Sequence, residues 1–68
     1  MTSPQDEQQR RWAEALAFEK QWGVDAPLRI AERIGVVALL GDEQGIARLK
    51  QIAACVDQII QAKVRNAQ

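Results

Sequence analysis

The chain has 68 residues, with nine basic and nine acidic side chains, no histidine and a formal net charge of zero. A domain of this size buries only about 60% of the surface of its unfolded chain, and it usually needs disulfides, a metal or oligomerisation for stability. Cys55 is the only cysteine, which excludes an internal disulfide and a multi-cysteine zinc site. Oligomerisation is the remaining means of support.

The charge pattern and the hydropathy also limit the partners. Neither sign of charge collects in one segment, whereas a nucleic-acid-binding protein usually presents a basic face. The longest apolar run, Ile34 to Leu40, has seven residues and is far shorter than the ~20 residues that span a bilayer. We therefore expect a cytoplasmic protein without a nucleic-acid or membrane partner.

Residues 4–22 are predicted to form the first helix. Ser3 is a candidate N-cap and Pro4 suits the first helical turn, while Gly23 provides a C-terminal stop. Apolar residues recur at helical spacing, and they are Trp12, Ala15, Leu16, Phe18 and Trp22. We expect the two tryptophans to anchor the core and not to stack on a ligand.

Residues 26–40 are predicted to form the second helix. Asp25 is its candidate cap, Pro27 falls in the first turn, and the chain leaves the helix at Gly41. Its main apolar stripe consists of Ile30, Ala31, Ile34, Val37 and Ala38. A buried strand from Ile34 to Leu40 is the alternative, although a lone strand would leave its backbone groups without partners.

Residues 43–65 are predicted to form the third helix, which Asp42 would cap. Its apolar stripe is the broadest in the chain and consists of Ile46, Leu49, Ile52, Ala53, Val56, Ile59, Ile60 and Val64. The short connection at Gly41 and Asp42 makes the second and third helices antiparallel neighbours. The expected fold is all-α, a single domain over residues 1–68 with frayed ends at 1–3 and 66–68, built as an up-down-up three-helix bundle.

A second apolar face on the helix at 26–40 has no partner within such a bundle. It contains Leu28, Val36, Leu39 and Leu40, and Val64 extends the set on the third helix. Exposed apolar patches usually mark interfaces. We therefore predict a small protein–protein interaction module that self-associates, as a two-fold homodimer, through these residues. The alternative is an adaptor or regulator that uses the same face to bind a helix of another protein.

The sequence contains no set of residues typical of catalysis. The only hydroxyl side chains are Thr2 and Ser3, and there is no histidine to activate them. We expect no enzyme, no catalytic or metal-binding residue and no cofactor, and we interpret Cys55 as a small buried hydrophobic residue.

Glu19 is the one acid that falls within the apolar arc of the first helix. It is either a site acid or a structural acid that pairs with a lysine such as Lys63, or with the first amides of the second helix, and the structural role is favoured. A Glu19→Gln variant that kept its fold but lost an activity would favour the site role.

The segment from Ile30 to Val36 matches the first half of a helix-turn-helix pattern, which makes DNA binding a remote alternative. The match ends there, because the recognition helix would begin with Val37, Ala38, Leu39 and Leu40, which cannot read base edges.

The central block combines Ile30-Ala31-Glu32-Arg33-Ile34-Gly35 with Ala38-Leu39, Gly41-Asp42 and Gly45, and Ala15-Leu16 and Glu19 lie upstream. This pattern, over roughly residues 12 to 57, resembles a family of short bacterial proteins classed as a domain of unknown function. The resemblance implies a small helical protein, and it brings no activity, cofactor or catalytic residue with it.

Overall fold

The computed structural model describes residues 4–66, and no strand occurs among them. Helical backbone runs from residue 4 to residue 39, with one 3-10 turn on the way, and again from residue 43 to residue 66. In chain order the elements are α1 (Pro4–Trp22), the 3-10 turn η1 (Gly23–Asp25), α2 (Ala26–Leu39) and α3 (Glu43–Asn66). The all-α prediction is confirmed, and the alternative of a strand from Ile34 to Leu40 is wrong.

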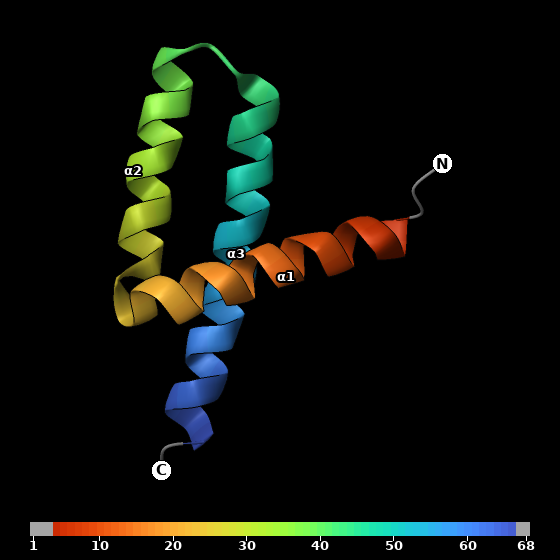
Figure 1. The fold of residues 1–68 in the computed structure, drawn as a ribbon, viewed down its shortest axis with the longest axis vertical. Coiled ribbons are helices and arrows are strands. Elements are labelled where there is room, and N and C mark those ends of the chain that lie inside the picture. The colour runs from red at the N-terminus through yellow and green to blue at the C-terminus, as the bar shows by residue number, and fades with distance from the viewer. Residues whose placement is uncertain (1–3, 67–68) are drawn as a thin grey trace.

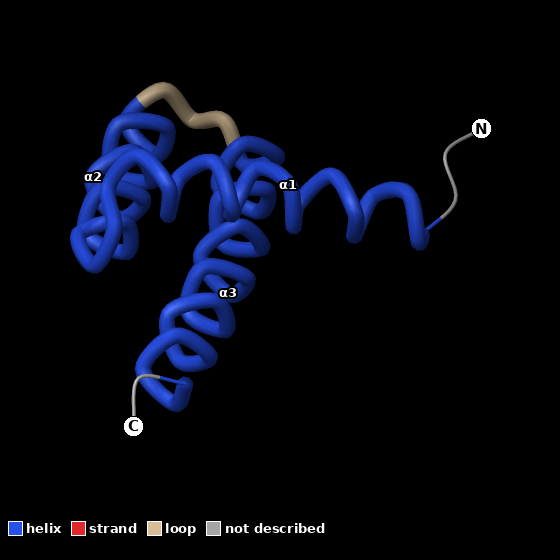
Figure 2. Tube along the Cα trace, turned by 60° about the horizontal axis from the view of Figure 1, so that its bottom comes forward, coloured by secondary structure: helices blue, strands red, loops and turns tan. Residues whose placement is uncertain are grey.

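The helices are not arranged as an up-down-up bundle. Helices α2 and α3 form an antiparallel hairpin, and α1 lies across this hairpin, where it packs mainly against α3 (Figures 1 and 2). The chain changes direction at η1, where Gly23 has a φ of 58°, a conformation that favours glycine. The three residues of η1 turn the chain but do not reverse it. Helices α1 and α2 are therefore not antiparallel neighbours, although the connection between them is short.

The crossing limits what α1 can bury. Ala15 is the only buried residue of α1, and its small side chain lets the helix approach the hairpin closely. The expectation that Trp12 and Trp22 anchor the core is wrong, because their side chains remain 40% and 38% exposed. The crossing buries only the part of α1 at Ala15, so Trp12 and Leu16 beside it, as well as Trp22 at the C-terminal end of the helix, keep part of their surface in solvent.

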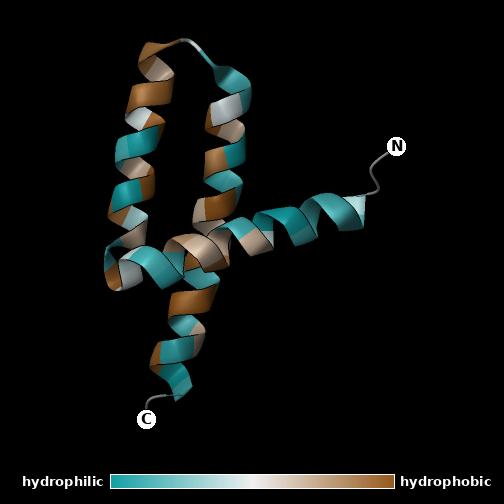
Figure 3. Ribbon diagram, in the orientation of Figure 1, coloured by the Kyte–Doolittle hydropathy of each residue, from teal (hydrophilic) through white to brown (hydrophobic). Residues whose placement is uncertain are grey.

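The core lies where the three helices meet. The buried residues of the core are Ala15, Ala26, Ile30, Leu49, Ile52, Val56 and Ile59. Four of these seven residues belong to α3. Phe18 and Cys55 are half-buried and pack against it. In Figure 3 hydrophobic residues occur along the whole of α2, whereas the N-terminal part of α1 is hydrophilic.

The predicted caps had different outcomes. The backbone N–H of Gly45 donates to Oδ1 of Asp42 at 3.0 Å, so the cap of α3 is confirmed. Asp25 does not cap α2 with its side chain, because its backbone is already helical and continues η1 directly into α2. Ser3 and the expected frayed residues 1–3, 67 and 68 lie outside the described residues, and α3 continues through Asn66.

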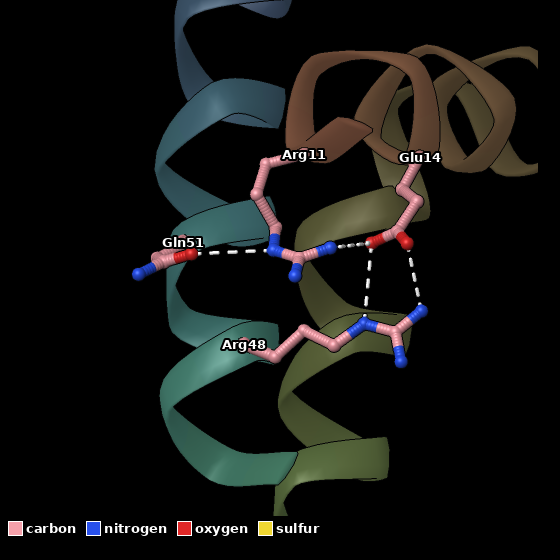
Figure 4. A network of polar contacts seen from close by, with 4 residues as sticks. All are labelled: Arg11, Glu14, Arg48 and Gln51. Atoms are coloured by element: carbon pink, nitrogen blue, oxygen red, sulfur yellow. Dashed lines mark hydrogen bonds and ion pairs between the residues drawn. The ribbon is translucent and has the colours of Figure 1, made fainter. Parts of the chain in front are cut away.

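An ion pair and a hydrogen bond join α1 to α3 on one side of the crossing. Glu14 accepts hydrogen bonds from Arg48, at 2.7 Å between Oε1 and Nη2, and from Arg11 at 3.1 Å (Figure 4). Arg11 also donates to Oε1 of Gln51 at 3.2 Å. Partial burial raises the pKa of Glu14, but the hydrogen bonds and charges of Arg48 and Arg11 outweigh this effect and hold the pKa below its ordinary value.

A second ion pair joins α1 to α3 further along both helices. Lys63 donates to Oε1 of Glu19 at 2.5 Å, and the Glu19 side chain is only 11% exposed. The pairing with Lys63 considered from the sequence is therefore present in the structure. Together with Glu14 and Arg48, this pair fixes α1 across α3 at two points.

Candidate functional site

The outer face of α2, defined by Leu28, Ala31, Gly35, Val36 and Leu39, points away from the core. Its large side chains are strongly exposed, at 59% for Leu28, 58% for Val36 and 90% for Leu39. Leu40 follows in the turn and is 78% exposed, whereas Ile30 on the opposite face is completely buried. The predicted interface residues Leu28, Val36 and Leu39 on α2, and Leu40 in the turn, are therefore all exposed to solvent.

Val64, the fifth residue of the predicted interface, is 58% exposed but lies elsewhere. It belongs to the C-terminal part of α3, and Figure 1 places that part at the opposite end of the molecule from the turn that follows Leu39. The structure does not bring Val64 together with Leu39 and Leu40.

Two glycines in the hairpin have opposite surroundings. A Cβ atom on Gly45 would lie 2.6 Å from Oδ2 of Asp42 and 2.9 Å from Cγ1 of Val37, so the contact between α2 and α3 requires this glycine. A Cβ on Gly35 would meet no atom within 4 Å, and its φ is negative. Nothing within residues 4–66 explains a glycine inside α2, where it costs about 0.5 to 1 kcal/mol relative to alanine.

Beside the outer face, a hollow of about 330 Å³ separates the end of α1 from α2. Its lining residues are Phe18, Trp22, Arg29, Glu32, Arg33 and Val36. The guanidinium carbon of Arg29 lies 4.6 Å from the centre of the Trp22 ring, and that of Arg33 lies 5.4 Å from the centre of the Phe18 ring. The hollow therefore combines aromatic surface with two cations.

The acids near this hollow leave one arginine without an acidic partner. Glu32 pairs with Arg29 at 3.4 Å, and Glu14 in the adjoining hollow is already bound by Arg11 and Arg48. Among the described side chains no carboxylate forms an ion pair with Arg33. The hollow thus carries an excess of one positive charge in a chain whose formal net charge is zero.

Sequence reasoning did not find this hollow. It treated Phe18 and Trp22 as core residues, and the position of α1 across the hairpin was not predictable from apolar spacing. The available signal was the pair Arg29 and Arg33, four residues apart on one helix face just after an aromatic helix end.

Other candidate features have structural explanations. Residues 30–39 lie in α2 without a break, so the turn that a helix-turn-helix pattern would place there is absent. In the part of the chain that the structure describes, no three cysteine, aspartate or glutamate side chains gather as they would around a metal ion. None of the helices between residues 4 and 66 has the length and apolar character needed to cross a membrane.

Comparison with known proteins places the chain in one family. No curated protein and no solved structure matches it. Residues 7–64 match a family of unknown function, DUF6961, and this match covers most of the chain. The protein therefore belongs to the DUF6961 family, whose function is not known.

Proposed function

We propose that this protein is a small protein–protein interaction module that self-associates through the outer face of α2. The observation that carries the proposal is that Leu28 and Leu39 are exposed on either side of Gly35, a glycine that its own fold does not require. Apolar patches of this kind usually mark interfaces. A glycine on a helix surface lets the backbone of a second helix approach closely.

The spacing of these residues suits an antiparallel pair of α2 helices. Leu28 and Leu39 are eleven positions apart, about 16 Å along a helix, and are symmetric about the midpoint between Arg33 and Ile34. Glu32 and Gly35 are symmetric about the same midpoint. A two-fold axis there would pack Leu28 of one copy against Leu39 of the other, and would place Glu32 over Gly35, where no side chain competes for space.

Self-association also answers the question of stability raised by the size of the chain. The core contains only seven buried hydrophobic residues among those described, and α2 contributes two of them. Covering Leu28, Val36 and Leu39 would remove a second set of apolar side chains from water, each worth up to about 1.5 to 3 kcal/mol when fully buried. Dimerisation would therefore supply stability that this chain cannot gain from an internal disulfide or a multi-cysteine zinc site.

Sedimentation equilibrium with two matched variants tests the proposal. Leu28 and Val64 are 59% and 58% exposed, so Leu28→Glu and Val64→Glu make comparable changes in charge at comparable exposure. We expect the wild type and Val64→Glu to dimerise at micromolar to high micromolar concentration, and Leu28→Glu to remain a monomer. A wild-type monomer throughout this range, or equal behaviour of the two variants, would contradict the proposal.

A further inference from the structure

We propose that the hollow formed by Phe18, Trp22, Arg29, Glu32, Arg33 and Val36 binds an acidic helix of a different protein, through carboxylates one helical turn apart. This surface adjoins the outer face of α2 and shares Val36 with it, so the proposal concerns a different partner from the self-association described above and is also tested in a variant that weakens the dimer. Three observations identify the partner: the arginines are held in place and one of them is unpaired, the two arginines are four positions apart, and this chain has no two acids at a matching spacing.

The arginines are held in place before any partner arrives. The guanidinium carbons of Arg29 and Arg33 lie over the rings of Trp22 and Phe18, within the range of a cation–π interaction, and this interaction restrains both side chains. A guanidinium matches the two oxygens of a carboxylate, and the restraint lowers the entropy lost when the hydrogen bonds form. Arg33, which has no ion-pair partner among the described residues, is the main anchor, and Arg29 binds the second carboxylate by giving up its long, solvent-exposed contact of 3.4 Å with Glu32.

The spacing of the arginines sets the shape of the ligand. Arg29 and Arg33 are four positions apart, so their Cβ atoms lie about 5 to 6 Å apart on one face of α2. Two acids three or four positions apart on a partner helix have the same separation. Val36 and the aromatic rings supply apolar surface for the side chain between those acids, as in helix-in-groove recognition.

A second copy of this chain does not carry that pattern. None of its nine acidic residues is three or four positions from another, so no helix of this sequence presents two carboxylates one turn apart. Nucleic acid is a poorer fit, because the lining of the hollow has a net charge of only one, and Arg48 on the adjoining surface is paired with Glu14. The chemistry of the hollow therefore favours an acidic helix from another protein.

The experiment uses a synthetic probe and Trp22 as the reporter. In a Trp12→Phe background, Trp22 is the only tryptophan, and it lines the hollow. The probe is an alanine-based helical peptide, acetylated and amidated, with two glutamates four positions apart and a leucine between them. The control peptide has glutamines in place of the glutamates. Binding is measured by the fluorescence of Trp22 and by calorimetry.

We expect saturable binding of the glutamate peptide, no binding of the glutamine peptide, and weaker binding as salt concentration rises. Arg33→Glu and Arg33→Gln should each weaken binding about tenfold or more, and Arg33→Lys should weaken it because a lysine cannot form the bidentate contact. Arg65→Glu changes the net charge as Arg33→Glu does, at an exposed position on α3, and should leave affinity unchanged. Circular dichroism verifies that each variant is folded.

Four results would overturn the inference. They are no binding at millimolar glutamate peptide, equal binding of the two peptides, affinity that does not depend on Arg33, and binding of a single-stranded oligonucleotide in place of the peptide. Because Val36 belongs to both surfaces, the same titrations are repeated in a Leu39→Lys variant, which removes an exposed leucine of the outer face that does not line the hollow and adds no acid. If the peptide does not bind, the proposed self-association is not affected, because sedimentation equilibrium tests it separately.

Discussion

Nη2 of Arg48 on α3 lies 2.7 Å from Oε1 of Glu14 on α1, so this ion pair joins helices that meet at a crossing. The Glu14 side chain is only 29% exposed, and Arg11 binds its other oxygen. The pair fixes the position of α1, and that position in turn forms the hollow between Phe18, Trp22 and α2.

Removing the charge of Glu14 should weaken the attachment of α1. We expect Glu14→Gln to lower the free energy of unfolding by about 1 kcal/mol, because the arginines lose a charged acceptor at a partly exposed site. Asp57→Asn is the control, since Asp57 is exposed and forms no ion pair within residues 4–66, and it should change stability by less than about 0.5 kcal/mol. Urea denaturation followed by circular dichroism measures both, and equal values would contradict the role given to Glu14.

The same carboxylate should make stability depend on acid pH. The pKa of Glu14 is held below its ordinary value of 4.5, so its contribution is fully present above that value and is lost as pH falls through the lower pKa of the folded state. The difference in unfolding free energy between wild type and Glu14→Gln should be constant near neutral pH and shrink below pH 4.5. A difference that grew on acidification would have the wrong sign.

The crossing itself depends on the small side chain of Ala15. Because Ala15 is completely buried where α1 meets the hairpin, Ala15→Leu should overpack the contact and cost about 1 to 3 kcal/mol. Ala13→Leu places the same side chain at an exposed position of α1 and should have little effect. Thermal unfolding of the two variants measures the difference, and tolerance of leucine at position 15 would mean that α1 is not seated as described.

Gly35 and Gly45 should respond to alanine with opposite signs. At low protein concentration Gly35→Ala should stabilise the monomer by about 0.4 to 1 kcal/mol, since α2 gains helix propensity and the new methyl meets open space. At high concentration it should weaken the dimer, because the methyl separates the paired helices. Gly45→Ala should destabilise at every concentration, since its methyl would strike Val37 and the capping side chain of Asp42. Denaturation at two protein concentrations separates these effects, and a Gly35→Ala variant that dimerised more tightly would contradict the antiparallel arrangement.

The sequence predicted the helical segments well because their signals are local. Predicted ranges of 4–22, 26–40 and 43–65 lie within one residue of α1, α2 and α3, with ends set by Gly23, Gly41 and the cap at Asp42. Apolar periodicity also predicted that Ile30 is buried and that Leu28 and Leu39 lie on another face, but it wrongly assigned Ala31 and Ala38 to the buried stripe, since both are exposed.

The direction of α1 was not predictable in the same way. Apolar spacing predicts which side of a helix is buried, but it does not predict the angle at which the neighbouring helix crosses it. The angle depends on the backbone of η1, on the close contact at Ala15 and on ion pairs between residues far apart in sequence, such as Glu14 and Arg48. The exposure of Trp12 and Trp22, and the hollow beside Arg33, follow from that angle and were missed with it.

Disulfide trapping tests most directly whether two copies meet through the outer face of α2. Single-cysteine variants are made in a Cys55→Ser background, which removes the only native cysteine. When Leu28→Cys and Leu39→Cys proteins are mixed and oxidised mildly, the antiparallel arrangement predicts a mixed disulfide in excess of either like pair, and little dimer from Val64→Cys. Absence of the mixed disulfide, or equal trapping at position 64, would contradict the account.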